Sequence, residues 1–346
     1  MKEPLKLTHF SHGAGCGCKI SPKVLDSILR GNESVPSGPV LVANDARDDA
    51  AVYDLGNGTA LLATTDFFMP VVDDPLDFGR VAAANALSDI YAMGGRPLMA
   101  LSLLGWPVDK IPPEIASRVV EGALQICLEA GISIAGGHSI DSQEPIFGLS
   151  VNGLADLNHI KRNNSARVGN LLFLTKPLGT GILTTAAKKG WISPEDLDTV
   201  TRQMSRLNRV GEALGRMEAV RAMTDVTGFG LLGHLKEMAE GSSCSALLHF
   251  GSIPLIQVNL EAYIGQGAIP GGTNRNWESY GQRVSTLSPF QKTILADPQT
   301  SGGLLIALDP AGLPEFERIL EMYGLADFRS PIGEMVHGED PLIRVD

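Results

Sequence analysis

Residues 60–95 read ALLATTDFFMPVVDDPLDFGRVAAANALSDIYAMGG and join a strand signal to a helix signal. The apolar, β-branched run over 60–72 predicts a strand. From Pro75 onward apolar residues recur at helical spacing, and the pair Gly94-Gly95 is typical of a helix end. The apolar face of this predicted helix consists of Phe78, Val81, Ala82, Ala86, Ile90 and Met93. A strand followed by a helix is therefore the predicted unit.

Strands and helices continue to alternate along the chain. The predicted strands lie at 97–106, 132–139, 146–154, near 245–250 and at 303–308. The predicted helices lie at 22–30, 113–130, 194–215, 229–240 and 314–323. The polar stretch 156–170 is the best candidate for a domain boundary. This order fits a layered α/β or α+β architecture.

Composition limits the class of protein. A chain of 346 residues exceeds the usual size of one core, so we expect two domains. The formal net charge of −11 argues against general binding to nucleic acid, and a bound nucleotide would need metal ions to offset repulsion. The first residues lack a secretory signal and no apolar run reaches membrane-spanning length. We therefore expect a cytoplasmic protein without a membrane partner, with its four cysteines reduced.

Several aspartates stand in glycine-rich or apolar surroundings, where a carboxylate normally has a partner. Asp89, which lies in an otherwise apolar helical stretch, has two possible kinds of partner. One possible partner is an arginine, Arg80 or Arg96, in a structural ion pair. The other is a magnesium ion shared with phosphate oxygens, because magnesium prefers hard oxygen ligands. The aspartates in question are Asp48, Asp49, Asp66, Asp89 and Asp225.

Glycine-rich motifs suggest a nucleotide site of an unusual kind. The chain has no G-x-x-x-x-G-K-[ST] motif, which excludes a P-loop. GFGLLG at 228–233 matches G-x-G-x-x-G, but the stretch before it is a poor parallel strand, interrupted by Asp225. These glycines can still open a helix whose N–H groups favour an anion. AGGHS at 135–139 ends a predicted strand and forms either an ordinary turn or a phosphate contact.

The segment HGAGCGCKIS, which starts at His12, is too rich in glycine to belong to a core. Cys16 and Cys18 are too close for an easy disulfide. A zinc site that also uses His9 and His12 is one alternative. The other is a reactive thiolate stabilised by the ammonium group of Lys19. We interpret the segment as a mobile arm that delivers a thiol and a lysine to a phosphate site.

Taken together, the motifs resemble the selenophosphate synthetase family over nearly the whole chain. The resemblance implies a two-domain α+β fold like that of aminoimidazole ribonucleotide synthetase, with an N-terminal sheet that forms a homodimer interface. The motifs, in family order, are HGAGCGCK (12–19), RDDAAVY (47–53), TTDFFMP (64–70), NALSDIYAMGG (85–95), AGGHSI (135–140), TDVTGFGLLGH (224–234), PGGTNRN (270–276) and DPQTSGGLL (297–305).

The resemblance also implies a reaction and a set of site residues. Selenide, ATP and water would give selenophosphate, AMP and phosphate, and selenophosphate is the selenium donor for selenocysteine and selenouridine. By motif position, Cys16 is the active cysteine and Lys19 the essential lysine. The implied magnesium ligands are Asp49, Asp89 and Asp225. The implied nucleotide contacts are Lys19, Ala46, Arg47, Asp48, Asp66, Asp89, Gly137, His138 and Ser139.

The implied domains are a catalytic arm with a short helix at 1–48, an ATP-binding, magnesium-binding and dimerisation domain at 49–156, and a C-terminal domain at 169–346. Whether selenide arrives free or from a delivery protein stays open, as does whether Cys16 carries selenium or positions the arm. A thiamine-monophosphate kinase would share the acidic motifs without the CGCK arm. A hydrogenase-maturation relative would end in a cysteine, whereas this chain ends PLIRVD. A metal or selenium carrier without enzymatic activity would not need the separated aspartates.

Overall fold

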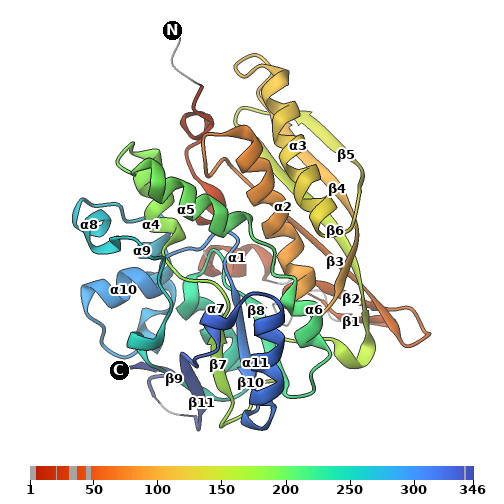
Figure 1. Ribbon diagram of the computed structural model, residues 1–346, viewed down its shortest axis with the longest axis vertical. Helices are drawn as coiled ribbons and strands as arrows, with labels where there is room; N and C mark the ends of the chain where they lie inside the picture. The colour runs from red at the N-terminus through yellow and green to blue at the C-terminus, as the bar shows by residue number, and fades with distance from the viewer. Residues whose placement is uncertain (1–4, 21, 31–36, 44–47, 339) are drawn as a thin grey trace.

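The computed structural model describes residues 5–20, 22–30, 37–43, 48–338 and 340–346, and contains two six-stranded sheets, each with helices packed on it (Figure 1). The first sheet has the order β1-β2-β3-β6-β4-β5. Its strands are β1 (Val40–Val42), β2 (Ala51–Asp54), β3 (Thr59–Phe68), β4 (Arg96–Trp106), β5 (Ile134–Asp141) and β6 (Ile146–Asp156). The β4–β5 pair is parallel and the other neighbours are antiparallel.

Helices α2 (Pro75–Ala92) and α3 (Pro113–Glu129) cover one face of this sheet (Figure 1). Asp74 caps α2 by accepting hydrogen bonds from the first-turn N–H groups of Leu76 and Asp77. The two helices approach backbone to backbone, because a Cβ at Gly79 would lie 1.8 Å from the carbonyl oxygen of Val119. The strand and helix predicted from residues 60–95 are thus both present.

The other face of the first sheet carries large apolar side chains in the open. Along β3 and β4 the residues alternate between the helix-covered face and this outer face, as the strand period requires. The exposed apolar residues on this sheet include Leu41, Tyr53, Phe67, Leu98, Met99, Leu101 and Ile140. A face of this kind is typical of an interaction surface.

The second sheet has the order β12-β9-β11-β7-β10-β8, and its neighbours are antiparallel except for the β12–β9 pair. Its strands are β7 (Leu171–Leu174), β8 (Val220–Asp225), β9 (Ser245–Leu248), β10 (Leu304–Leu308), β11 (Gly333–Val336) and β12 (Ile343–Val345). The helices of this half are α4 (Thr180–Lys188), α5 (Pro194–Ser205), α6 (Val210–Gly215), α7 (Gly230–Gly241), α8 (Leu260–Gly265), α9 (Gly271–Tyr280), α10 (Pro289–Leu295) and α11 (Leu313–Met322).

Two local expectations for this half need correction. The single helix expected at 194–215 is two helices, because Arg206 has an extended backbone and the side chain of Asn208 is held in the interior by Ser88 and Gly302. GFGLLG matches G-x-G-x-x-G, the pattern of dinucleotide-binding folds, but such a fold is excluded because β8 lies at a sheet edge and pairs antiparallel with β10. The glycines do open a helix, with Gly230 at φ 69° as the first residue of α7.

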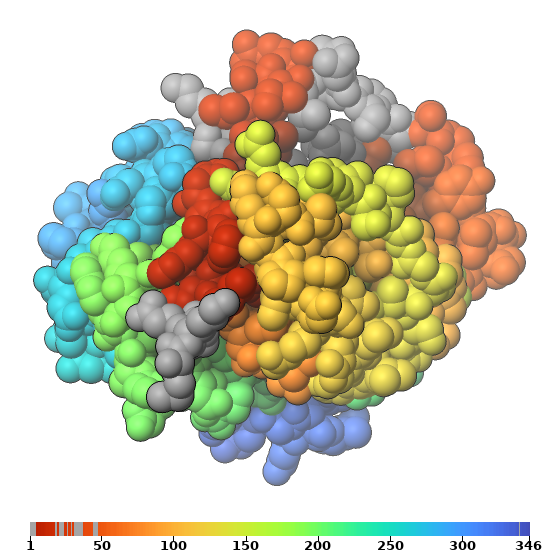
Figure 2. Space-filling model, turned by 90° about the horizontal axis from the view of Figure 1, so that it is seen from above, coloured from red at the N-terminus to blue at the C-terminus, as the bar shows by residue number. Residues whose placement is uncertain are grey.

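The arm begins with two short 3₁₀ turns, Leu7–Phe10 and Gly15–Cys18, followed by α1 (Pro22–Leu29). Figure 2 shows the red arm lying between the orange and yellow first half and the green and cyan second half. Ser21, the residue that precedes α1, lies outside the described residues. Among the helices that the structure describes, none combines the length and the hydropathy that a membrane span requires.

Candidate functional site

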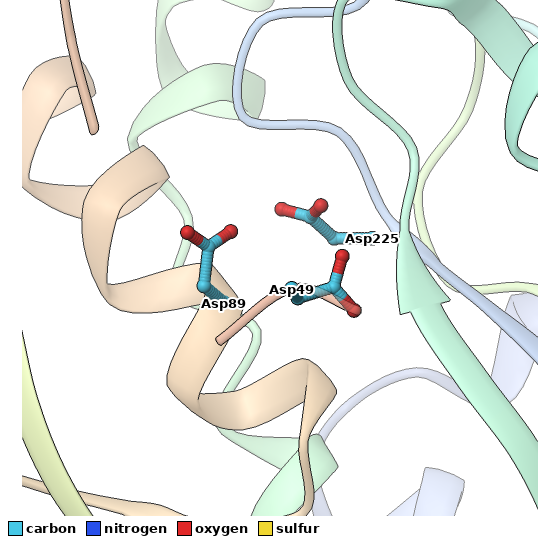
Figure 3. Close-up of side chains that lie close together, drawn as sticks. All are labelled: Asp49, Asp89 and Asp225. Atoms are coloured by element: carbon cyan, nitrogen blue, oxygen red, sulfur yellow. The ribbon is translucent and has the colours of Figure 1, made fainter. Parts of the chain in front are cut away.

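Three aspartates from distant segments converge where the two halves meet (Figure 3). Asp49 precedes β2, Asp89 lies on α2 and Asp225 is the last residue of β8. One carboxylate oxygen from each lies within 4.8 Å of the corresponding oxygens of the other two. Among the described residues this is the one group of acidic, histidine or cysteine side chains arranged for a metal ion. The sequence-predicted magnesium ligands therefore do come together.

The electrostatics of this group favour a bound cation. Burial, with the neighbouring carboxylates, raises the pKa of Asp49 and of Asp89 well above the ordinary value. Burial raises the pKa of Asp225 to about 6, against the influence of Ser88 and Lys19. Among the described atoms, Oδ2 of Asp49 and Oδ2 of Asp225 are buried without a hydrogen-bond partner. An all-oxygen set with two such atoms fits magnesium, which takes hard oxygen ligands.

Neighbouring hydroxyl groups fix the orientation of two of these carboxylates. Thr64 Oγ1 donates to Asp89 Oδ2 at 2.6 Å, and Thr224 Oγ1 donates to Asp49 Oδ1 at 2.9 Å. Each threonine holds one carboxylate oxygen, so the other oxygen can face a ligand. The donor set is thus oriented before any ligand binds.

The arm brings Cys16 and Lys19 to the same region. The Cys16 thiol is 1% exposed, and its Sγ donates to Asn85 Oδ1 at 3.2 Å. Lys19 Nζ lies 3.3 Å from Asp66 Oδ2, which also accepts from Asn85 Nδ2 at 2.6 Å. Burial by itself lowers the pKa of Lys19, but Asp66 and other nearby acidic groups raise it above its ordinary value. Lys19 therefore carries a positive charge beside the aspartates.

Asn85 is a residue whose function the sequence did not reveal. It contacts Cys16 and Asp66, and its Oδ1 also accepts from the backbone N–H of Ser301 at 2.9 Å. Ser301 has φ 51°, a left-handed conformation that is uncommon outside glycine. The sequence did offer one indication of its role, because Asn85 lies one helical turn before Asp89 on the same face of the helix.

Of the predicted nucleotide contacts that precede β2, two lie outside the described residues and one is bound to other protein groups. Ala46 and Arg47 lie outside the described residues. Asp48 binds Arg162 Nε at 3.1 Å through Oδ2 and the N–H of Asn163 through Oδ1. Its role toward a nucleotide stays a prediction.

The segment Gly137, His138 and Ser139 lies inside β5 and is exposed, where the sequence predicted a strand end. Residues in register across the sheet place Gly137 three strands from Asp66, or about 14 Å at the usual strand spacing. Within one chain these three residues are therefore separate from Asp66.

Two alternatives from the sequence do not hold. Neither Arg80 nor Arg96 pairs with Asp89 among the described residues, because Arg80 binds Asp77 and Gln125 while the Asp89 carboxylate accepts from Thr64. The zinc site with His9 and His12 is not seen among the described side chains, where the His12 ring contacts Glu144 and the Cys16 thiol contacts Asn85; the Cys18 side chain lies outside this description.

The carboxylate of Asp297 is buried in the C-terminal half. Its Oδ2 accepts from Gln299 Nε2 at 2.8 Å and from the N–H of Gly181 at 3.0 Å. Burial nevertheless raises its pKa from 3.8 to about 8. Between these values the unfolded chain binds fewer protons than the folded one, so this group makes stability fall as pH rises. We expect Asp297→Asn to remove that fall, gaining about 3 kcal/mol over the parent between pH 5 and pH 8.

Urea unfolding of the parent and of Asp297→Asn at both pH values measures this difference. The exposed Asp327→Asn serves as the control, since it makes the same chemical change at the surface. If the stability difference between parent and Asp297→Asn is the same at pH 5 and pH 8, the carboxyl group is not held protonated in the fold.

Comparison with known proteins adds to this geometry. Family models for the N-terminal and C-terminal domains of AIR synthase related proteins match residues 47–155 and 167–346. The selenide, water dikinase of Colwellia psychrerythraea is 55% identical over 340 residues, covering 98% of each chain. That of Pseudomonas putida is 54% identical over 346 residues, covering all of both chains. A solved structure described as AaThiL complexed with AMPPCP and TMP matches with a TM-score of 0.67 at 18% identity, covering 94% of this chain and 93% of that one.

Proposed function

The chain belongs to the selenide, water dikinase family, and we propose that its acidic cluster and its arm together form the site of that reaction. The protein is a phosphotransferase that makes selenophosphate from selenide, ATP and water. Its α+β fold consists of two AIR synthase related domains. The observation that carries the assignment of the site is the convergence of Asp49, Asp89 and Asp225, with the Lys19 ammonium close enough to Asp89 and Asp225 to interact with their charges.

In this proposal the three aspartates hold magnesium, whose positive charge would neutralise the triphosphate of ATP. Lys19, beside Asp66, adds a positive charge where the γ-phosphoryl group passes to selenide. The selenium–phosphorus bond forms as the bond to the bridging oxygen breaks, which leaves ADP. Water then attacks ADP to give AMP and phosphate. Both transfers need in-line placement and charge neutralisation more than covalent help from the protein.

The three parts of the chain divide this work. Residues 1–48 contain the arm, which covers the site and whose buried Cys16 excludes bulk water. Residues 49–156 supply Asp49, Asp66 and Asp89, while residues 169–346 supply Asp225. The site therefore exists only when the two halves are together. Among the described residues Cys16, Cys127 and Cys244 form no disulfide, which suits a reducing compartment, so we propose that the enzyme is cytoplasmic.

We further propose that the enzyme is a homodimer joined through the exposed face of the first sheet. Exposed apolar residues along β3, β4 and β5 support this arrangement. It would also explain why Gly137, His138 and Ser139 lie about 14 Å from Asp66 in one chain, since these residues can then face a nucleotide held by the other copy.

A Leu101→Asp variant is expected to be a monomer, because it puts a charge in the middle of the exposed sheet face. Sedimentation velocity at micromolar concentration measures the change. Leu128→Asp is the matched control, since Leu128 is 69% exposed on α3, away from the sheet face. A dimeric Leu101→Asp protein, or a parent that is itself monomeric, would contradict the proposed interface.

Phosphorus NMR tests the proposed function directly. The protein is incubated with ATP, magnesium and selenide, and we expect resonances of selenophosphate and AMP in equal amounts. Chelation of magnesium or omission of selenide should abolish both. Replacement of selenide by thiamine monophosphate distinguishes the kinase alternative, for which a diphosphate product would appear instead.

A further inference from the structure

The closed arm is held from the C-terminal half by two basic side chains. Lys188 Nζ, at the end of α4, donates to the carbonyl oxygen of Ser11 at 2.8 Å and to that of Gly13 at 3.0 Å. Arg275 Nη2, on α9, donates to the carbonyl oxygen of Gly17 at 2.8 Å. Both helices belong to the half that lies on one side of the arm in Figure 2.

These contacts lie on either side of the reactive cysteine. Gly13 is three residues before Cys16 and Gly17 is the residue after it, so the two cations bracket the thiol. The backbone N–H of Cys16 itself donates to Thr300 Oγ1 at 3.1 Å. The position of the thiol over the site is therefore set by its main chain rather than by bulky side chains of the arm.

The choice of main-chain acceptors follows from the sequence of the arm. A segment with glycine at 13, 15 and 17 has few side chains with which to bind a partner. A cavity of about 680 Å³ lies between the arm and the C-terminal half, lined in part by Lys188 and Arg275. The polar contacts of Lys188 and Arg275 with the arm thus lie at this cavity. Hydrogen bonds from a charged donor are the stronger class of such contacts.

We propose that Lys188 and Arg275 are positioning residues that hold the arm closed over the acidic cluster. They act on the reaction through Cys16 and Lys19, which the closed arm places beside Asn85 and Asp66. The catalytic consequence rests on the proposed function, whereas the closure itself does not.

The first test measures how often the arm opens, without any turnover. In a Cys18→Ser background, iodoacetamide labels Cys16, and mass spectrometry of the peptide 7–19 gives the rate. We expect Lys188→Ala and Arg275→Ala each to raise the rate by about tenfold, as the loss of a charged hydrogen bond implies. Because both residues act on one closing equilibrium, the double variant should approach the product of the two effects.

Matched variants separate this role from a general loss of charge or of folding. Lys189→Ala removes the same charge one position further on, but Lys189 donates to the carbonyl oxygen of Gly267, so labelling should stay at the parent rate. Lys188→Arg keeps a cation in place and should restore slow labelling. Hydrogen exchange of the arm backbone checks that access has changed, since ionisation of the thiol does not affect it.

Steady-state kinetics form the second test. Both alanine variants should lower kcat about tenfold and leave the KM for ATP within twofold, with recovery in Lys188→Arg. Parent-like labelling and exchange in a folded Lys188→Ala, Arg275→Ala double variant would overturn the proposal. If labelling changes as expected while the parent makes no selenophosphate, the proposed function fails and the closure stands.

Discussion

An Asp225→Asn variant is expected to lose magnesium-dependent ATP turnover by about a thousandfold or more, and to become more stable in the absence of metal. The loss follows because the remaining pair would bind the cation poorly, and neutralisation of the phosphates contributes several kcal/mol to the transition state. The gain in stability follows because Asp225 is buried with an unpartnered Oδ2 beside two other carboxylates, among the residues described.

The sign of the stability change depends on pH. Burial raises the pKa of Asp225 from 3.8 to about 6, so the folded state keeps this proton at pH values where the unfolded state has released it. In the metal-free protein this contribution makes stability fall as pH rises from about 4 to about 6, and the loss then persists above pH 6. The asparagine variant lacks that contribution.

Thermal unfolding at pH 7.5 in EDTA and in excess magnesium checks both parts. The parent should gain stability on addition of magnesium, whereas Asp225→Asn should start higher and gain little. Asp198→Asn is the control, because Asp198 is exposed on α5 and its partner is Arg202. An Asp225→Asn protein that responds to magnesium like the parent would show that the cluster does not bind the metal.

The local elements were predictable because their signals are local. The strand at 60–72 and the helix from Pro75 follow from apolar spacing, and both exist as β3 and α2. The residue types of the acidic cluster were also visible, since aspartates in apolar surroundings need partners. The spacing of apolar residues did not predict that Asp49 and Asp225, which are 176 residues apart in the sequence, lie close together. That expectation came from the family resemblance.

The remaining surprises come from tertiary contacts. The break between α5 and α6 depends on Asn208, whose amide bonds to Ser88 in the other half of the molecule. The role of Asn85 depends on Ser301, whose N–H reaches it from 216 positions away. No periodicity encodes such pairs, because each member has an ordinary polar residue type in its own segment.

A Lys19→Ala variant is expected to lower kcat for selenophosphate formation between about a hundredfold and a thousandfold, with the KM for ATP changed only a few-fold. The ammonium group of Lys19 lies 3.3 Å from Asp66 Oδ2 and stabilises the negative charge that develops during phosphoryl transfer. The acidic cluster and its metal hold the triphosphate in the ground state. Phosphorus NMR under saturating ATP and magnesium gives the rate.

The control for this prediction is Lys19→Arg, which keeps the charge but spreads it over a larger, planar group. It should close the arm and protect Cys16 from alkylation about as well as the parent, yet transfer the phosphoryl group more slowly. Lys19→Ala at the parent rate would remove the lysine from the reaction. An equal loss of kcat in Lys19→Ala and Lys19→Arg would instead show that the compact ammonium group itself is needed. Both variants lack that group, whereas only Lys19→Ala lacks the positive charge.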